Sequence, residues 1–202
     1  MALTKTNITV HEWATVAAGA VVRSSVFNNE GNYGGSIDIQ SFLDSNTAHI
    51  GTEFIIQISG ATVGDENWQD LTRFVDLVGT ATSLTISNNP LAAGSTLINA
   101  ATVSTGFSST DVALRWIGCK DATLADCELM QPTTISVSTS MGIVDPTTNA
   151  HVQNTVIWNI AMSKSISLPP ATPRARVVIN NLYDSNGSGL AFKVRGVGIT
   201  AL

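Results

Sequence analysis

The stretch Arg174–Val197 decides the fold class: it reads RARVVINN at residues 174–181, LYDSNGSG at 182–189 and LAFKVRGV at 190–197. Two strand-like runs flank a turn rich in Asp, Asn and Gly, which is typical of a β-hairpin. Val, Ile, Thr and Ser recur through the rest of the chain, with Gly and Asn at the breaks. The sequence therefore predicts an all-β protein whose last two strands pair as a hairpin.

Strand signals continue toward the N-terminus. Residues 52–59, TEFIIQIS, place Phe54, Ile56 and Ile58 on one face, and residues 36–42 alternate in the same way. GATVGDENWQD at 60–70 is predicted to turn into a second hairpin, with a short helix over 70–77 as the alternative. About eight strands of this kind favour an antiparallel β-sandwich of jelly-roll-like type.

The strand-like alternation of the sequence weakens after the Asn-Asn-Pro of residues 88–90. Short strands are predicted in the following part at 96–100, 112–117, 133–138 and 155–159. We expect residues 89–158 to form a small β-barrel module, inserted into a sandwich formed by residues 1–88 and 159–202.

Composition limits the function classes. At 202 residues, the chain can bury about 70% of its unfolded surface and needs no disulfide or metal. Only 12% of the residues are charged, so the surface can pack against neighbours at little desolvation cost. The net charge of −5 argues against a nucleic-acid partner, which requires a basic face. No apolar run is long enough for a membrane-spanning helix.

Cysteine use indicates a reducing compartment. Cys119 and Cys127 are the two cysteines of the chain, and one pair is not a disulfide framework. The opening MALTKTNITVHEW lacks the apolar segment of a secretory signal. We expect free thiols and assembly in the cytoplasm, with a single bridge as the alternative.

Positive charge collects near the end of the chain. From residue 164 onward the net charge is +4, whereas the preceding residues carry −9. Arg174 and Arg176 share a strand face, as do Lys193 and Arg195, because side chains two residues apart point the same way. If the two strands pair, four cations line one solvated face. Such a face either deters edge aggregation or docks an acidic neighbour.

No catalytic, cofactor-binding or metal-binding residue is predicted, so we expect a protein that is not an enzyme. The three histidines, His11, His49 and His151, belong to no ligand motif such as HExxH. The chain also lacks the G-x-S-x-G elbow of a nucleophilic serine. Carboxylates gather at residues 65–70 and 121–128, where acidic residues of β-turns explain them without any chemistry.

Trp68 is the aromatic residue of greatest interest. The other tryptophans, Trp13, Trp116 and Trp158, are expected to fill the core. Trp68 follows GDEN in a predicted turn, where an indole could stack on a sugar or enter a partner's pocket. A carbohydrate-binding or host-receptor-recognition module is therefore the alternative to an assembly subunit. It predicts several coplanar exposed aromatics, whereas an assembly subunit predicts a broad contact face of low charge.

Several phrases resemble small β-rich virion structural proteins of tailed bacteriophages, of the head decoration, neck or collar, or fibre-associated type. TEFIIQISGATVGDENWQDLTRFV resembles their pattern of a strand, a Gly-containing turn, and a next strand with a Trp and an acidic residue. WIGCKDATLADCELMQ resembles their compact β-barrel inserts. RARVVINNLYDSNGSGLAFKVRGVGITAL resembles their closing hairpin. The resemblance implies a structural role in a virion assembled in the host cytoplasm, with other virion proteins and copies of the chain itself as partners. It transfers no catalytic residue. The expected contact residues are Trp68 as the apolar anchor and Arg174, Arg176, Lys193 and Arg195 as the polar complement.

Overall fold

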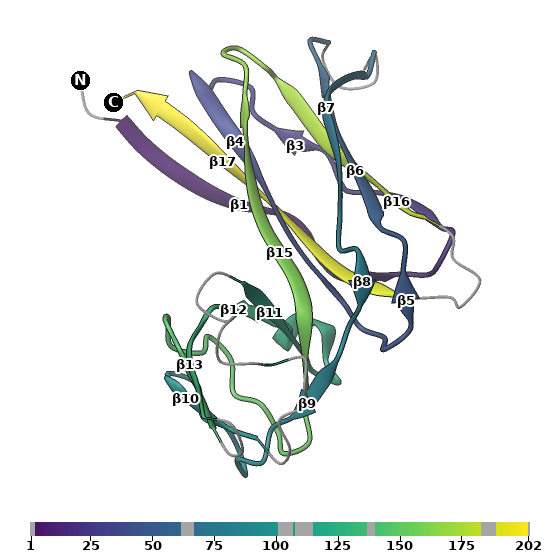
Figure 1. The fold of residues 1–202 in the computed structure, drawn as a ribbon. Coiled ribbons are helices and arrows are strands. Elements are labelled where there is room, and N and C mark those ends of the chain that lie inside the picture. The colour runs from purple at the N-terminus through teal and green to yellow at the C-terminus, as the bar shows by residue number, and fades with distance from the viewer. Residues whose placement is uncertain are drawn as a thin grey trace.

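The computed structural model describes residues 3–61, 67–100, 107, 115–136, 140–182 and 189–201. In this part of the chain the protein is built from strands, with one 3-10 turn, η2 (Leu124–Asp126). Figure 1 shows a larger sandwich and a smaller group of strands below it, with the two termini together at the far end of the sandwich. The expected all-β class is confirmed.

Two antiparallel sheets form the sandwich. Sheet A contains, in order, β1 (Leu3–Val16), β17 (Leu190–Ala201), β4 (Gly34–Leu43) and β15 (Val156–Leu168). Sheet B contains β2 (Val21–Arg23) and β3 (Phe27–Asn28) along one edge, followed by β16 (Arg174–Asn181), β6 (Thr52–Ser59) and β7 (Gln69–Asp76).

The pairing of these strands is nested. The first strand pairs with the last (β1 with β17), the β2 and β3 edge pairs with β16, β4 pairs with β15, and β6 pairs with β7. Pairing of β17 with β4 and of β16 with β6 joins these couples into two sheets. This order, in which the chain folds as one long doubled ribbon, is that of a jelly roll. The predicted jelly-roll-like sandwich is confirmed.

The predicted closing hairpin is wrong. β16 lies in sheet B and β17 lies in sheet A, so the chain crosses between the two sheets after Asn181. A polar, Gly-rich connection serves a crossing as well as a hairpin, so composition could not separate the two. Residues 183–188 of the predicted turn at 182–189 lie outside the described residues.

The other predicted hairpin is confirmed in its pairing. β6 and β7 are antiparallel from Thr52 opposite Asp76 to Ile58 opposite Gln69. The alternative helix over 70–77 is wrong, because residues 70–76 belong to β7 and Leu77 follows the strand. Phe74 of β7 stacks on Phe54 of β6 with ring centroids 5.3 Å apart, a cross-strand aromatic contact that stabilises the strand form.

The sandwich encloses an apolar core between its sheets. Inward side chains alternate with outward ones along β4, β6, β16 and β17, as the period of two requires. The fully buried members include Ile37, Ile39, Phe54, Ile56, Val177, Ile179, Phe192 and Val194.

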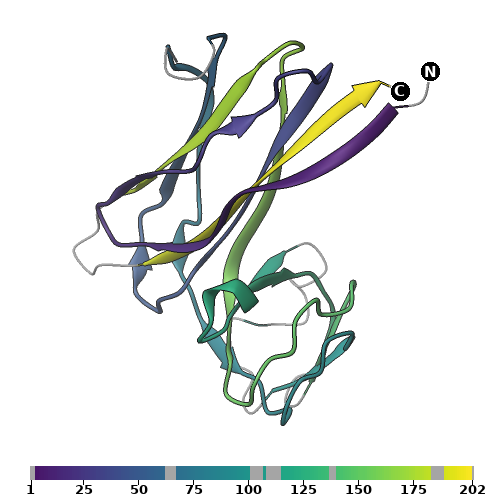
Figure 2. The ribbon, with the colours of Figure 1, turned by 180° about the vertical axis from the view of Figure 1, so that it is seen from behind.

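Short strands connect the sandwich to the smaller group of strands, and other short strands make up that group. β5 (Ala48–His49) pairs with β8 (Gly79–Thr80), and β9 (Ser83–Thr85) pairs with β15. β10 (Leu97–Asn99), β14 (Ser140–Ile143) and β13 (Pro132–Ser136) form a separate sheet, while β11 (Trp116–Lys120) and β12 (Glu128–Met130) extend sheet A beyond β15. Figure 2 shows these last strands curled around a common centre.

We call residues 89–155 the inserted module. It shares a second apolar core with β9 and β15, whose members include Ile86, Ile98, Ile117, Met141 and Ile157. The predicted strand at 112–117 overlaps β11 only at its end, and residues 108–114 lie outside the described residues. The expected small β-barrel insert is thus present in the fold.

β15 belongs to both parts of the molecule. Its first residues pair with β9 and β11, and residues from Ala161 to Leu168 pair with β4. It therefore runs unbroken through positions 158 and 159, where the predicted domains meet. The division into 1–88 with 159–202 and 89–158 stays a prediction.

The inserted module packs on the outer face of sheet A. Trp13, Phe42 and Ala191 point outward from this sheet and form a small core with Cys127 of the module. Gly118 of β11 lies so close to Phe42 that an added Cβ would clash with its ring. This close contact allows β11 of the module to pack directly against the outer face of sheet A.

Candidate functional site

The five predicted contact residues fall on two separate faces. Arg174 and Arg176 lie on β16 in sheet B with Trp68 nearby, whereas Lys193 and Arg195 lie on β17 in sheet A. Because β16 and β17 do not pair, the expectation of four cations on one face is wrong.

Arg174 is buried rather than solvated. Its side chain is shielded from solvent, and its Nη2 donates a hydrogen bond to Glu30 Oε1 at 3.1 Å. This ion pair ties β16 to the loop after β3. A buried arginine held in this way supports the strand and offers no free cation to a partner.

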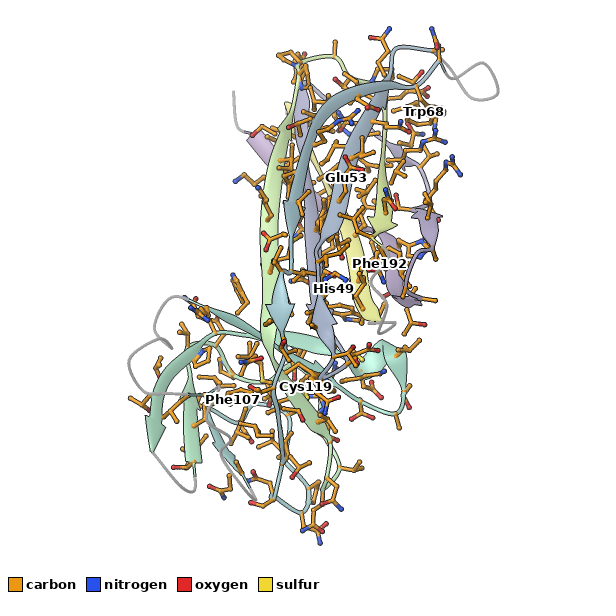
Figure 3. The ribbon with its side chains drawn as sticks, turned by 45° about the vertical axis from the view of Figure 1, so that its right-hand side comes forward. His49, Glu53, Trp68, Phe107, Cys119 and Phe192 are labelled. Carbon is orange, nitrogen blue, oxygen red and sulfur yellow. The ribbon has the colours of Figure 1, made fainter. Side chains whose placement is uncertain are left out.

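Arg176 and Trp68 form one unit on the outer face of sheet B. The guanidinium carbon of Arg176 lies 4.1 Å from the Trp68 ring centroid, and its Nε donates to Gln57 Oε1 at 2.9 Å. Trp68 is half-buried. A cation–π contact of this kind orients the indole at the surface. Figure 3 shows Trp68 at the end of the sandwich far from Cys119 and Phe107 of the inserted module.

The rest of this outer face mixes exposed valines with balanced charge. Val21 and Val75 are 53% and 54% exposed and lie in one row across the sheet, on either side of Asn180 and Glu53. Arg73 pairs with Asp70 at 2.6 Å and with Glu53 at 3.5 Å. We call the outward residues of β2, β16, β6 and β7, together with Trp68, the sheet B face.

A groove of about 350 Å³ lies where the inserted module meets the outer face of sheet A. The sandwich contributes Gln40, Lys193 and Arg195, with Trp13 beside them. The module contributes, among others, Trp116, Asp145, Pro146, Thr148 and Asn149. Lys193 Nζ lies 3.0 Å from Glu12 Oε2, whose side chain is 66% exposed. Arg195 is exposed and forms no ion pair with any residue that the structure describes.

Beneath one wall of this groove lies a buried histidine. His151 is fully buried; its Nδ1 lies 3.1 Å from Asp121 Oδ2 and its Nε2 lies 2.6 Å from Glu128 Oε1. Burial lowers the pKa of His151, but the hydrogen bonds and charges of Glu128 and Asp121 outweigh it and raise the pKa above its ordinary value. We call His151, Asp121 and Glu128 the histidine cluster. Both ring nitrogens donate to carboxylates when the ring is charged.

The two cysteines are free, as expected, and both are buried. Burial raises the pKa of Cys119 and that of Cys127, and nearby carboxylates add to the rise at Cys119. Both groups therefore stay as thiols near neutral pH, which is unsuited to nucleophilic attack.

The other groups considered for chemistry have structural partners. His11 stacks on Phe192 with centroids 4.8 Å apart, and buried His49 lies 2.7 Å from both Leu77 O and Asn181 Oδ1. Asp70 binds Gln57 and Arg73, while the neighbouring Asp65 and Glu66 lie outside the described residues. Among the described residues no group of three or more His, Cys, Asp or Glu could hold a metal ion.

A membrane-spanning helix is also absent from the part of the chain that the structure describes. Each helical segment there is too short or too polar to cross a bilayer.

Sequence reasoning did not find the histidine cluster or the groove. The sequence places Asp121 and Glu128 in one acidic group, but His151 lies 30 and 23 residues away from them. Nothing local in DPTTNAH signals that its histidine is enclosed. Trp13 and Trp116 were assigned to the core, and the groove arises where core-forming tryptophans reach the edge of two packed parts.

Comparison with known proteins gave solved structures of low similarity. No family model matches the chain, and no curated protein is similar to it. Similar solved structures include infectious bursal disease virus, Gt strain (8% identity, 98% of this chain and 42% of that chain, TM-score 0.27). Others are the SPBc2 prophage-derived protein YomS (13%, 95% and 96%, TM-score 0.21) and VP17, a capsid protein of bacteriophage P23-77 (7%, 100% and 99%, TM-score 0.20).

The chain spans 42% of the length of the bursal disease virus chain that it matches. At these TM-scores the similarities carry no argument about function. The jelly-roll assignment rests on the strand order described above.

Proposed function

We propose that this chain is a non-enzymatic structural subunit of a tailed-phage particle, in capsid decoration, the neck or the tail. It acts through protein–protein contacts with copies of itself and with other virion proteins, after assembly in the host cytoplasm. The observation that carries the proposal is the sheet B face, where Trp68 stacks on Arg176 near exposed Val21 and Val75. A jelly roll is a fold that capsid proteins use.

The size of the molecule fits a contact function. A stable protein interface buries about 1,200 to 2,000 Å² in total, or about 800 Å² on each partner. The exposed area of the chain is 9618 Å², so one face of the sandwich is large enough. Trp and Arg are the residue types that most often dominate such interfaces.

A second copy is the first partner to consider. The sheet B face carries Arg23, Arg73 and Arg176 against Glu53 and Asp70, while residues before 164 carry a net charge of −9. Acidic surface on one copy is therefore complementary to the arginines of another. Virion parts occupy symmetric positions, which favours repeated use of one contact.

The alternative, carbohydrate binding or host-receptor recognition, is not favoured at Trp68. The guanidinium of Arg176 already lies over the indole ring, so that face is not open to a sugar. The proposed role of Trp68 as an apolar anchor requires only the part of the indole that Arg176 does not cover.

The proposal is tested by light scattering on size-fractionated protein at several concentrations. We expect a defined oligomer for the natural chain and a monomer for Trp68→Ala, with both folded by circular dichroism. Val152→Ala, which truncates a 61% exposed valine on the inserted module, serves as the matched control and should leave the mass unchanged. A natural chain that stays monomeric, or a Trp68→Ala variant with the full oligomer mass, contradicts the proposed contact.

A further inference from the structure

The groove between the inserted module and the outer face of sheet A has the features of a ligand site that is independent of the sheet B face. Its volume of about 350 Å³ lies within the range of small-molecule pockets, about 300 to 1,000 Å³. It forms where two parts of the chain meet, which is a frequent place for binding sites. Its walls therefore come from residues far apart in the sequence.

The groove continues along sheet A. A second hollow of about 370 Å³ shares Gln40 and Arg195 with the first. Its lining includes a cation, an amide, a carboxylate and hydroxyls, from Lys5, Asn7, Asp38, Ser36, Ser163 and Ser165. Arg195 therefore lies between two adjoining hollows, and a ligand with several units in a row fits this shape better than a single compact one.

The side chains of the groove match a saccharide. Gln40, Gln131 and Asn149 offer amide groups that donate and accept hydrogen bonds, as neighbouring sugar hydroxyls require. Trp116 is half-buried in the wall and supplies an aromatic surface for the apolar side of a sugar ring. An acidic peptide can also bond these amides through its backbone, so the stacking surface of Trp116 is the feature that favours a sugar.

The charges of the groove indicate an acidic sugar. Arg195 forms no ion pair with the described residues, and its guanidinium can bind a carboxylate through two hydrogen bonds. Among the described residues the ion-pair partner of Lys193 is the exposed Glu12. On the module side the carboxylate of Glu128 is already engaged by His151 and by the backbone N–H of Thr148 at 2.8 Å. Lys5 adds a third cation in the adjoining hollow, while Asp145 and Asp38, which lies opposite Arg195 in sheet A, are the opposing carboxylates.

The wall of the groove is held in place before any ligand arrives. Glu128 is fixed by the histidine cluster, and Asn149 Nδ2 donates to Asp126 O at 3.2 Å. Trp13 packs on Phe42 with ring centroids 5.3 Å apart. A prebuilt wall lowers the ordering cost of binding.

We propose that this groove binds an acidic oligosaccharide, with Arg195 as the carboxylate-binding residue and Trp116 as the stacking residue. This binding function goes beyond the structural role and does not depend on it, since the sheet B face takes no part in it.

The test uses saturation-transfer NMR and calorimetry on the full chain with tetragalacturonate, the neutral cellotetraose and the peptide tetraglutamate. We expect binding of tetragalacturonate that is stronger than that of cellotetraose. Arg195→Gln should weaken tetragalacturonate binding about tenfold and leave cellotetraose unaffected. Arg23→Gln removes an exposed cation of the sheet B face and is the matched control, for which we expect no change.

Three results would overturn the proposal: no binding of tetragalacturonate, equal weakening by Arg195→Gln and Arg23→Gln, or tetraglutamate binding as tightly as the sugar. The last result would assign the groove to an acidic protein segment instead. Both arginines are exposed, so unchanged melting temperatures are expected and confirm that the variants fold.

Discussion

The sandwich and the inserted module are stabilised in different ways. The sandwich encloses an apolar core in which Phe54, Ile56 and Phe192 are fully buried. The module has an apolar core too, but beside it lies His151 between two carboxylates. Apolar burial does not depend on protonation, whereas a buried charged cluster does. The comparison predicts opposite responses to pH: the module loses stability as pH rises because the pKa of His151 is raised, whereas the sandwich loses stability as pH falls because burial lowers the pKa of His11.

The same difference separates the two proposed binding surfaces. The sheet B face belongs to the sandwich, and most of its outward side chains can be changed without opening the core. The groove is partly walled by Glu128, which also serves the histidine cluster. A variant in the groove wall can therefore lose binding because the module unfolds, so its melting temperature must be measured alongside. This control matters less for variants of the sheet B face.

Phe54→Ala should give the largest loss of stability. Removing a fully buried ring that stacks on Phe74 costs about 4 kcal/mol, because the cavity cannot close. Urea unfolding followed by circular dichroism measures the loss. Val75→Ala on the adjoining strand removes a 54% exposed side chain and should cost less than about 0.5 kcal/mol. Equal losses for both would mean that the sandwich core is not the main source of stability.

His151→Ala should destabilise the module by about 3 kcal/mol, because it leaves Asp121 and Glu128 buried without their shared partner. Hydrogen exchange should show faster exchange in β11 and β12 and unchanged protection in β6 and β16. Adding Glu128→Gln to this variant removes one of the two charges and should restore part of the protection. Loss of protection across both parts alike would show that the histidine cluster stabilises the whole molecule.

Stability of the module should fall as pH rises. The pKa of His151 is raised in the folded state above its ordinary value of 6.5, so the folded state binds the proton more tightly than the unfolded state. Its contribution is complete below pH 6.5 and is lost as pH rises through the folded pKa. Thermal unfolding of the natural chain and of His151→Ala between pH 5.5 and 9 measures it. The idea fails if both proteins show the same slope in that window.

Trp68→Ala should cost the monomer about 1 kcal/mol, because it loses the cation–π contact with Arg176. The measurement is thermal unfolding at a dilution where the natural chain is monomeric. A loss as large as that of Phe54→Ala would place Trp68 in the core and remove it from the sheet B face.

Glu12→Gln should have the smallest effect. It breaks the ion pair with Lys193, in which the Glu12 side chain is 66% exposed, so the change in stability should stay below about 0.5 kcal/mol. The same unfolding assay measures it. A larger loss would mean that this pair holds β1 against β17.

The sequence was a reliable guide to local structure and a poor one to pairing. The alternation of Phe54, Ile56 and Ile58 predicts β6, because a strand's period is a local property, and the turn-forming composition of residues 60–70 predicts its hairpin with β7. The partner of β16 was missed, since it is chosen by burial between sheets rather than by the turn that follows. Jelly-roll strands are joined largely by crossings, and these resemble hairpin turns in composition.

The candidate sites were predicted only where exposure follows from the local sequence. Trp68 was singled out from its polar turn and lies at the surface beside Arg176. Arg174 was expected in solvent but is buried against Glu30, because two residues of one strand face can meet different neighbours. The histidine cluster joins residues up to 30 positions apart, and no local pattern encodes such an enclosure.

The most direct test of the contact role is hydroxyl-radical footprinting of the natural chain at low and high protein concentration. The account predicts that Trp68, Val21 and Val75 become protected together as concentration rises, while Val152 and Leu97 of the inserted module keep the same reactivity. Reactivity of Trp68 that does not change with concentration, or protection confined to the module, would contradict the assignment of the sheet B face as the contact between subunits.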